Sequence, residues 1–134
     1  MSAGERAAAA ARGCVGARFR LHGRDMRHGL DCVGVAALSL RAAGHAGAVP
    51  TGYALRSGDW RPFARFAEGL ARASEAAPGD IVLCRVAPGQ VHLVVRTAGG
   101  FVHADAGLRR VVERPGEPPW PVMRAWRVRE QAEE

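Results

Sequence analysis

Hydrophobic and polar positions divide the chain into a helical first half and a second half of short strands. Apolar residues recur three or four apart before about residue 75, and short apolar runs alternate with Gly- and Pro-containing turns after it. The pattern predicts helices over Glu5–Gly13, over Cys32–Gly44, and from Asp59 or Trp60 to Ser74. It predicts strands over Ile81–Val86, Val91–Arg96, Phe101–Ala104, Leu108–Arg114 and Val122–Val128. Helices followed by a meander of strands indicate an α+β fold with an antiparallel sheet of about five strands.

The helix that begins at Cys32 is the most apolar predicted element. Only Ser39 and Arg41 are strongly polar within it, so we expect it to be covered on most sides. Asp31 is a natural N-cap and Gly44 a plausible C′ glycine. Backbone N–H groups and the helix dipole favour a thiolate at a helix N-terminus. The position therefore predicts a nucleophile with a lowered thiol pKa, with a small core cysteine as the alternative.

Two histidines fall inside predicted strands that a hairpin around Thr97–Gly100 would join. A loop of two or four residues makes paired residue numbers sum to an odd value, as 92 and 103 do, so His92 and His103 would share one face. A three-residue loop would separate them. His92 would then take the proton of the Cys32 thiol, and His103 would fix the tautomer of His92, with Asp105 as its rival in that role. The backbone N–H of Cys32 and a neighbouring donor would form an oxyanion hole.

The remaining histidines lie in predicted loops. The polar, basic loop Arg18–Asp25 leads into the Cys32 helix, and His22 within it is a candidate to line a cleft near the cysteine. We expect His28 and His45 at the surface. The Gly-, Pro- and Ser-containing stretch Gly44–Gly58 predicts a further loop.

Length and composition fit one domain over residues 1–134. The chain has 134 residues, 48% of them hydrophobic, which suits a core over about residues 12–128 and a flexible tail at Arg129–Glu134. No apolar run approaches the ~20 residues of a membrane span, and the N-terminus lacks the pattern of a secretory signal, so we expect a product made in the cytoplasm. The net charge of +6 favours an anionic partner. Dispersed arginines and the lack of a nucleic-acid-binding motif count against nucleic acid.

Cysteine usage argues against a disulfide framework. Cys14, Cys32 and Cys84 are few, odd in number and without a C-x-x-C pair, which is compatible with a reducing compartment. Cys14 and Cys84 have no activating neighbour in the sequence and are expected to be structural. Zinc bound by Cys32, Cys84, His92 and His103 is an alternative, but the short ligand pairs typical of such sites are missing. The sequence therefore predicts neither a metal nor a cofactor.

Several short motifs follow one another in a recognisable order. They are Phe19 and Gly23, Gly29-Leu30-Asp31-Cys32-Val33-Gly34, Pro78-Gly79-Asp80, His92-Leu93, and His103. In this order and spacing they resemble the NlpC-type papain-like cysteine peptidases of bacterial cell walls, over roughly Arg12 to Val112. The resemblance implies a papain-like α+β fold with Cys32 as nucleophile, His92 as base and His103 as third member.

The resemblance also implies a substrate class and a setting. Members of this family cleave amide bonds in peptidoglycan stem peptides, typically between D-glutamate and a diamino acid, and others are amidases. The loop containing Phe19 and His22, with the missing signal, is similar to the branch associated with phage tails and gene-transfer particles. The implied partners are therefore a stem peptide and tail or particle proteins, and the implied location is the virion or particle.

Two positions depart from the family pattern. Phe19 lacks the hydroxyl of the tyrosine often found before the cysteine loop, and Val33 replaces the serine that often follows the cysteine. These departures motivate one alternative, a tail or structural protein that keeps the fold and binds without cutting. A thiol amidase or acyltransferase is the other alternative.

Overall fold

The protein consists of helices packed against an antiparallel sheet, which confirms the predicted α+β fold. The computed structural model describes residues 1–47, 49–50 and 61–130. Within them the helices are α1 (Ala3–Gly13), α2 (Cys32–Ala42) and α3 (Arg61–Phe66). The strands are β1 (Arg24–Asp25), β2 (Gly29–Leu30), β3 (Ala71–Arg72), β4 (Ile81–Ala87), β5 (Gln90–Arg96), β6 (Gly100–Asp105), β7 (Arg110–Pro115) and β8 (Val122–Arg127). Strands β1 and β2 form a separate pair, and the others form one sheet in the order β3-β8-β4-β5-β6-β7.

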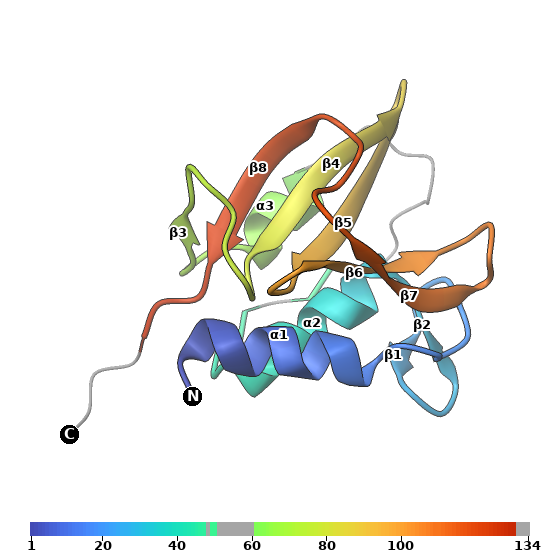
Figure 1. Cartoon of the computed structure of the whole chain (residues 1–134), viewed down its shortest axis with the longest axis horizontal. Helices are drawn as coiled ribbons and strands as arrows, with labels where there is room; N and C mark the ends of the chain where they lie inside the picture. The colour runs from blue at the N-terminus through green and yellow to red at the C-terminus, as the bar shows by residue number, and fades with distance from the viewer. Residues whose placement is uncertain (48, 51–60, 131–134) are drawn as a thin grey trace.

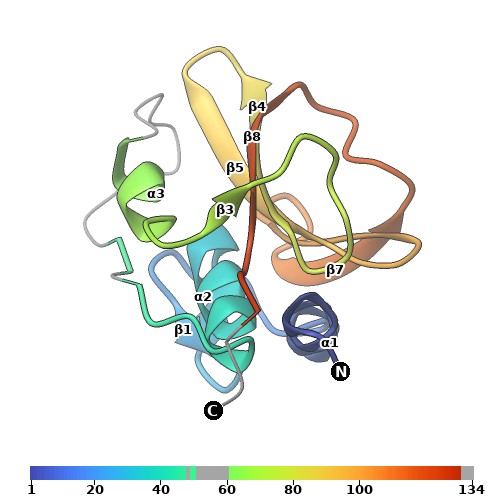
Figure 2. The same ribbon diagram turned by 90° about the vertical axis from the view of Figure 1, so that its left-hand side faces the viewer.

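Helices α1 and α2 lie side by side on one side of the sheet (Figure 1, Figure 2). Helix α1 contributes a buried stripe of small residues, Ala3, Ala7 and Ala11. Small side chains let two helices approach closely, so α2 can be buried between α1 and the sheet. One core cluster contains these alanines together with residues of α2 and β5, among them Leu40 and Leu93. The most apolar helix of the sequence is therefore the central helix of the fold.

The hairpin between β5 and β6 has the geometry that the sequence predicts for its two histidines. Val95 pairs with Val102 and Arg96 with Phe101, and the turn closes by hydrogen bonds between Thr97 and Gly100. Paired numbers thus have an odd sum. Alternate residues of a strand point to opposite faces, so Leu93, Val95, Val102 and Ala104 face the helices. His92 and His103 share the other face, which carries a second core cluster with Val94 and Phe101.

The helix predicted from Asp59 or Trp60 to Ser74 is wrong in its C-terminal part. Helix α3 ends at Phe66, and Ala71–Arg72, expected to be helical, forms β3 at the edge of the sheet beside β8. Gly69, with a φ of +89°, ends the helical path, because a left-handed residue cannot continue a right-handed helix. The sheet consequently has six strands and not five. The short pair β1–β2 was also not predicted, because two-residue strands leave no periodic signal.

Some expectations concern residues outside the described ranges. They are the start of the helix at Asp59 or Trp60, most of the loop Gly44–Gly58, and the end of the tail Arg129–Glu134. The single domain over residues 1–134 stays a prediction. None of the helices in the described residues is both long and apolar enough to cross a bilayer.

Candidate active site

Cys32 is the first residue of α2, and its backbone is held by the cap in front of it. Asp31 has extended backbone angles, and its Oδ1 accepts a hydrogen bond from the Gly34 N–H at 2.9 Å. This confirms Asp31 as the N-cap. A side chain on Gly34 would collide with the Gly23 carbonyl oxygen, so the glycine lets the loop lie directly against the first turn of the helix. Cap and loop together fix the direction in which the Cys32 side chain leaves the helix.

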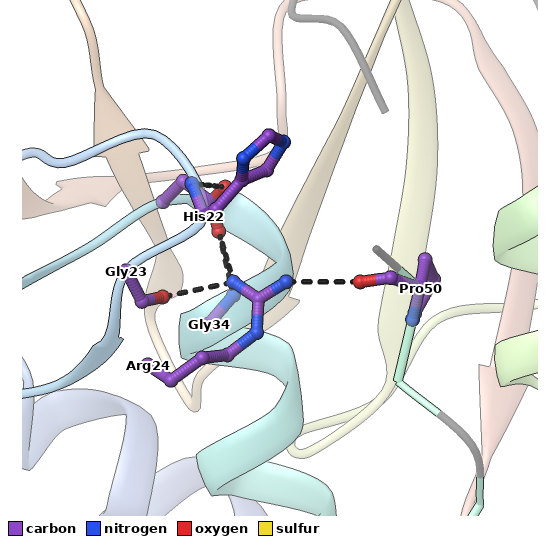
Figure 3. A network of polar contacts seen from close by, with 6 residues as sticks. His22, Gly23, Arg24, Gly34 and Pro50 are labelled. Atoms are coloured by element: carbon purple, nitrogen blue, oxygen red, sulfur yellow. Dashed lines mark hydrogen bonds and ion pairs between the residues drawn. The ribbon is translucent and has the colours of Figure 1, made fainter. Parts of the chain in front are cut away.

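The Asp31 carboxylate is completely buried and is satisfied by a network of donors (Figure 3). The His22 backbone N–H donates to Oδ2 at 2.7 Å, and Arg24 Nη1 donates to Oδ1 at 3.0 Å. Arg24 also donates to the Gly23 carbonyl at 2.9 Å and, through Nη2, to the Pro50 carbonyl at 3.0 Å. The network ties the loop before α2 to the cap. Arg24 was not identified from the sequence, because one arginine in a basic loop carries no distinguishing signal.

The His22 side chain does not line the cleft as the sequence led us to expect. The His22 side chain is exposed and is not among the residues that line the cavity at Cys32. Its contribution to the site comes from its backbone, which adopts a φ of +63° and directs its N–H at Asp31. His28 is exposed as expected. His45 is partly buried near Phe66, contrary to the surface position expected for it.

The predicted lowering of the Cys32 thiol pKa is wrong, and the structure gives the reason. Burial, and to a smaller extent the Asp31 charge, raises the pKa of Cys32 to about 12. Hydrogen bonding from the backbone N–H groups of Leu93, Val33 and Cys32 itself lowers the pKa, but by less than burial raises it. Cys32 is 8% exposed, and its thiol is neutral at rest. The carboxylate that stabilises the helix thus opposes ionisation of the cysteine beside it.

The Leu93 backbone lies beside the Cys32 sulfur, on the strand β5 that also contains His92. Leu93 follows His92 directly in β5, and α2 contacts both β5 and β6. The β5–β6 ladder comprises only Val95–Val102 and Arg96–Phe101, so the first half of β5 lies beyond it. The first turn of α2 meets β5 in that half, because the Leu93 N–H is a hydrogen-bonding neighbour of the Cys32 sulfur. Cys32 thereby lies against the strand that carries His92.

His92 and His103 form a hydrogen-bonded pair. His92 Nε2 lies 2.9 Å from His103 Nδ1, with the rings nearly perpendicular at 80°. This contact is diagonal in the hairpin register, as expected for two residues that share a face without being direct partners. Burial lowers the pKa of His92 to about 3 and also lowers the pKa of His103. Both rings are therefore neutral at rest, and one nitrogen of the pair must donate while the other accepts.

Trp120, from the proline-rich loop between β7 and β8, packs against the two imidazoles. Its ring centroid lies 5.8 Å from that of His92 and 5.5 Å from that of His103, in both cases edge to face. It also contacts Phe101 at 5.9 Å. Sequence reasoning missed Trp120, because an aromatic residue in a proline-rich loop does not reveal which strand it will cover. The tryptophan accounts for part of the desolvation that keeps the histidines neutral.

One open cavity of about 230 Å³ joins these groups. Cys32, His92 and His103 all line it, and so does Phe19. Further lining residues, not identified from the sequence, include Phe63, Gln90 and Trp120. The cavity is therefore lined by one thiol and one histidine pair, and its other lining residues are mostly apolar. This combination suits nucleophilic attack on an extended substrate.

Cys14 and Cys84 do not line this cavity, although Cys84 is the cross-strand partner of His92. Both are buried, and burial raises the pKa of each, that of Cys84 to about 11. Cys84 belongs to the second core cluster with Val94 and Phe101. In the residues that the structure describes, no group of three or more His, Cys, Asp or Glu is arranged to hold a metal ion.

Comparison with solved structures places this fold among NlpC/p60 domains. NlpC1 from Trichomonas vaginalis superposes with a TM-score of 0.70 at 22% identity, over 94% of this chain and 44% of that one. The peptidoglycan hydrolase RipB from Mycobacterium tuberculosis gives 0.67 at 19%, over 96% and 66%. The NlpC/p60 domain of the peptidoglycan hydrolase SagA gives 0.58 at 23%, over 84% and 88%. The chain spans less than half the length of NlpC1 and of NlpC2 from the same organism. No protein-family model and no curated protein matches the sequence.

Proposed function

We propose that this protein is a cysteine peptidase that hydrolyses an amide bond in peptidoglycan stem peptides. The observation that carries the proposal is the convergence of Cys32 and the hydrogen-bonded pair His92–His103 on one cavity. Three titratable side chains from α2, β5 and β6 rarely meet at a cavity without a chemical role. RipB and SagA, which have this fold, are themselves peptidoglycan hydrolases. The proposed roles are nucleophile for Cys32, general base for His92 and orienting group for His103.

The neutral resting state determines how the thiol must react. With the pKa of Cys32 raised and that of His92 lowered, burial disfavours each ion alone. The thiol proton therefore moves to His92 Nδ1 as the sulfur attacks the carbonyl carbon, because the paired charges then stabilise each other. The carbonyl oxygen becomes an oxyanion, and the proposed donor that stabilises it is the backbone N–H of Cys32.

Collapse of the tetrahedral adduct completes the first half-reaction. His92 returns the proton to the leaving amine, the C–N bond breaks, and a thioester between Cys32 and the acyl half remains. Water, deprotonated by His92, then attacks the thioester and releases the carboxylic acid and the free thiol. The hydrogen bond from His92 Nε2 to His103 Nδ1 keeps Nδ1 of His92 directed at the reacting groups throughout.

The proposed bond is the one between D-glutamate and the diamino acid of the stem peptide. Stem peptides carry free carboxylates, and the chain has a net charge of +6, which favours association with an anionic polymer. We further propose that the protein acts as a component of a phage tail or gene-transfer particle, with tail proteins as partners. The basic loop Arg18–Asp25, which is similar to that of the tail-associated branch, supports this setting.

Digestion of purified peptidoglycan tests the proposal. Wild-type protein is expected to release muropeptides whose new termini are D-glutamate and the amino group of the diamino acid, identified by mass spectrometry. Cys32→Ala and His92→Ala are expected to release none while keeping the wild-type unfolding temperature. Cys14→Ala is the matched control, because it removes a buried thiol at the end of α1 that does not line the cavity. Equal release by wild type and a folded Cys32→Ala would refute the proposed chemistry.

A non-catalytic binding protein with the same fold is the second candidate. The specific observation that favours it is the raised pKa of the Cys32 thiol, together with Val33 at the position where the family often has serine. It predicts that wild type and Cys32→Ala sediment equally with peptidoglycan and that neither releases fragments. A thiol amidase or acyltransferase would instead give a different product mass, so the same digestion separates the three activities.

A further inference from the structure

The far nitrogen of His103, Nε2, is buried, and His103 is 3% exposed. Among the residues that the structure describes, Nε2 has no hydrogen-bond partner. The Asp105 carboxylate faces it, with Oδ2 4.0 Å from Nε2. His103 and Asp105 are two residues apart on β6 and therefore on one face of the sheet. Because water does not reach Nε2, the Asp105 carboxylate is the charge that acts on this nitrogen in place of solvent.

Whether His103 Nε2 carries a hydrogen decides whether His92 can act as a base. If His92 is to accept the thiol proton at Nδ1, its Nε2 must carry hydrogen and donate to His103. His103 Nδ1 must then be the acceptor, so the hydrogen of His103 resides on Nε2. That N–H is buried, and it is stable there only if a negative charge lies in front of it. The opposite tautomer of His103 would reverse the hydrogen bond and remove the base.

We propose that Asp105 is a positioning residue that holds His103 in the tautomer with hydrogen on Nε2, and through it holds His92 ready to accept a proton at Nδ1. The proposal rests on the function proposed above. It places Asp105 behind His103 in a series, Cys32–His92–His103–Asp105, and not as its rival. Asp105 also lines the cavity, so only a variant in which His103 is already replaced separates its action through His103 from a direct contact with the substrate.

The other charged group near His103 supports a tautomeric role. Arg114 of β7 lies over the Phe101 and Trp120 rings, 5.6 and 5.7 Å from their centroids, and its charge acts against protonation of His103. His92, from β5, is neutral. The Asp105 carboxylate favours protonation of both rings, but burial outweighs it. His103 therefore stays neutral, and the position of its single hydrogen is the property left for Asp105 to control.

The two oxygens of Asp105 have separate contacts, which makes a selective substitution possible. Oδ1 accepts a hydrogen bond from the Leu108 N–H at 3.0 Å and holds the turn after β6. Oδ2 faces His103. Asp105→Asn keeps an oxygen for the Leu108 N–H and places an NH₂ donor in front of His103 Nε2. The variant thus preserves the turn while favouring the wrong tautomer.

Asp25 offers a matched control. Its Oδ1 accepts from the backbone N–H of His28, three residues on, as Asp105 does from Leu108, and its carboxylate also lies beside a histidine ring. Asp25 is exposed and does not line the cavity. Asp25→Asn therefore reports the cost of removing a carboxylate from such a turn without touching the histidine pair.

Two measurements test the proposal together. Long-range ¹H–¹⁵N NMR, assigned with His103→Asn, is expected to show hydrogen on His103 Nε2 in wild type and Asp25→Asn, and on Nδ1 in Asp105→Asn. On peptidoglycan fragments, Asp105→Asn is expected to lower kcat roughly tenfold to hundredfold, the range seen when the group orienting a functional histidine is lost, with KM unchanged. In a His103→Asn background, Asp105→Asn is expected to cause no further loss.

The outcomes separate this proposal from the proposed function. An unchanged His103 tautomer in Asp105→Asn overturns the proposal, whether or not the protein cleaves peptidoglycan. A changed tautomer with unchanged kcat also overturns it, as does an equal loss in the His103→Asn background. If wild type shows no hydrolysis, the proposed function fails, and the NMR comparison still decides whether Asp105 controls the His103 tautomer.

Discussion

The reactivity of Cys32 toward iodoacetamide should show that the resting thiol is neutral. Alkylation requires the thiolate, and the pKa of Cys32 is raised to about 12 by burial and by the Asp31 charge. The three cysteines lie on separate tryptic peptides, and His28–Arg41 contains Cys32 alone. Mass spectrometry of that peptide therefore gives the rate for this one thiol.

The expected rate follows from the thiolate fraction. At pH 7.5 an ordinary cysteine with a pKa of about 8.5 is about one-tenth thiolate, whereas a pKa of about 12 leaves about one molecule in thirty thousand. The higher basicity of the thiolate offsets about thirty- to fiftyfold of that difference, because nucleophilicity rises with pKa. Cys32 should thus react about a hundredfold more slowly than the same cysteine in the urea-unfolded protein. The rate should rise about tenfold per pH unit from pH 7 to pH 10 without a plateau.

A matched variant tests the cause. Asp31→Asn keeps an oxygen for the Gly34 N–H and removes the charge next to the sulfur. The variant should lower the pKa of Cys32 and speed alkylation, while Cys84 in the same sample keeps its rate. A rate for Cys32 that stays constant from about pH 5 to pH 8, or exceeds that of the unfolded chain, would refute the reasoning. It would indicate a preformed thiolate–imidazolium pair.

Three further predictions concern the supports of the site. Arg24→Met removes the partner of a buried carboxylate and should lower the free energy of unfolding by about 1–3 kcal/mol, measured in urea, and unchanged stability would contradict the role of the cap network. His92 has a folded pKa lowered to about 3, so below about pH 6.5 only the unfolded state binds its proton and stability is lost as pH falls. At about 1.4 kcal/mol per pKa unit, the free energy of unfolding should fall by about 3 kcal/mol at pH 4. His92→Gln should lose correspondingly less stability in acid. An equal loss in both proteins would argue against a neutral buried ring. Trp120→Leu should admit water and raise the pKa of His92 toward its ordinary value in an NMR titration, and an unchanged titration would show that the tryptophan does not shield the pair.

Local rules predicted the parts of the site that depend on neighbours in sequence. The Asp31 cap and the start of α2 follow from capping preferences, because the cap and its acceptor are three residues apart. The shared face of His92 and His103 follows from hairpin parity once the turn has an even number of residues, which is the case here. These local rules determine the direction in which a side chain points from its own helix or strand.

Distant contacts determined what the sequence did not reveal. Strand β3 forms because Ala71 pairs with Arg127, more than fifty residues away, and this pairing overrides a local helical pattern. The sign of the Cys32 pKa shift depends on burial against β5, which helix-dipole reasoning omits. Trp120 reached the histidines through a loop without periodicity. In each case the deciding partner lies in another element of the fold.

The most direct test of the central claim is detection of a covalent intermediate on Cys32. Wild-type protein is mixed with stem-peptide fragments, quenched in acid within seconds, and digested, and the His28–Arg41 peptide is weighed by mass spectrometry. The account predicts a peptide carrying the mass of the acyl half of the substrate, released by hydroxylamine as expected for a thioester and missing from Cys32→Ala. Substrate turnover by wild type without acyl mass on this peptide, together with equal turnover by Cys32→Ala, would contradict it.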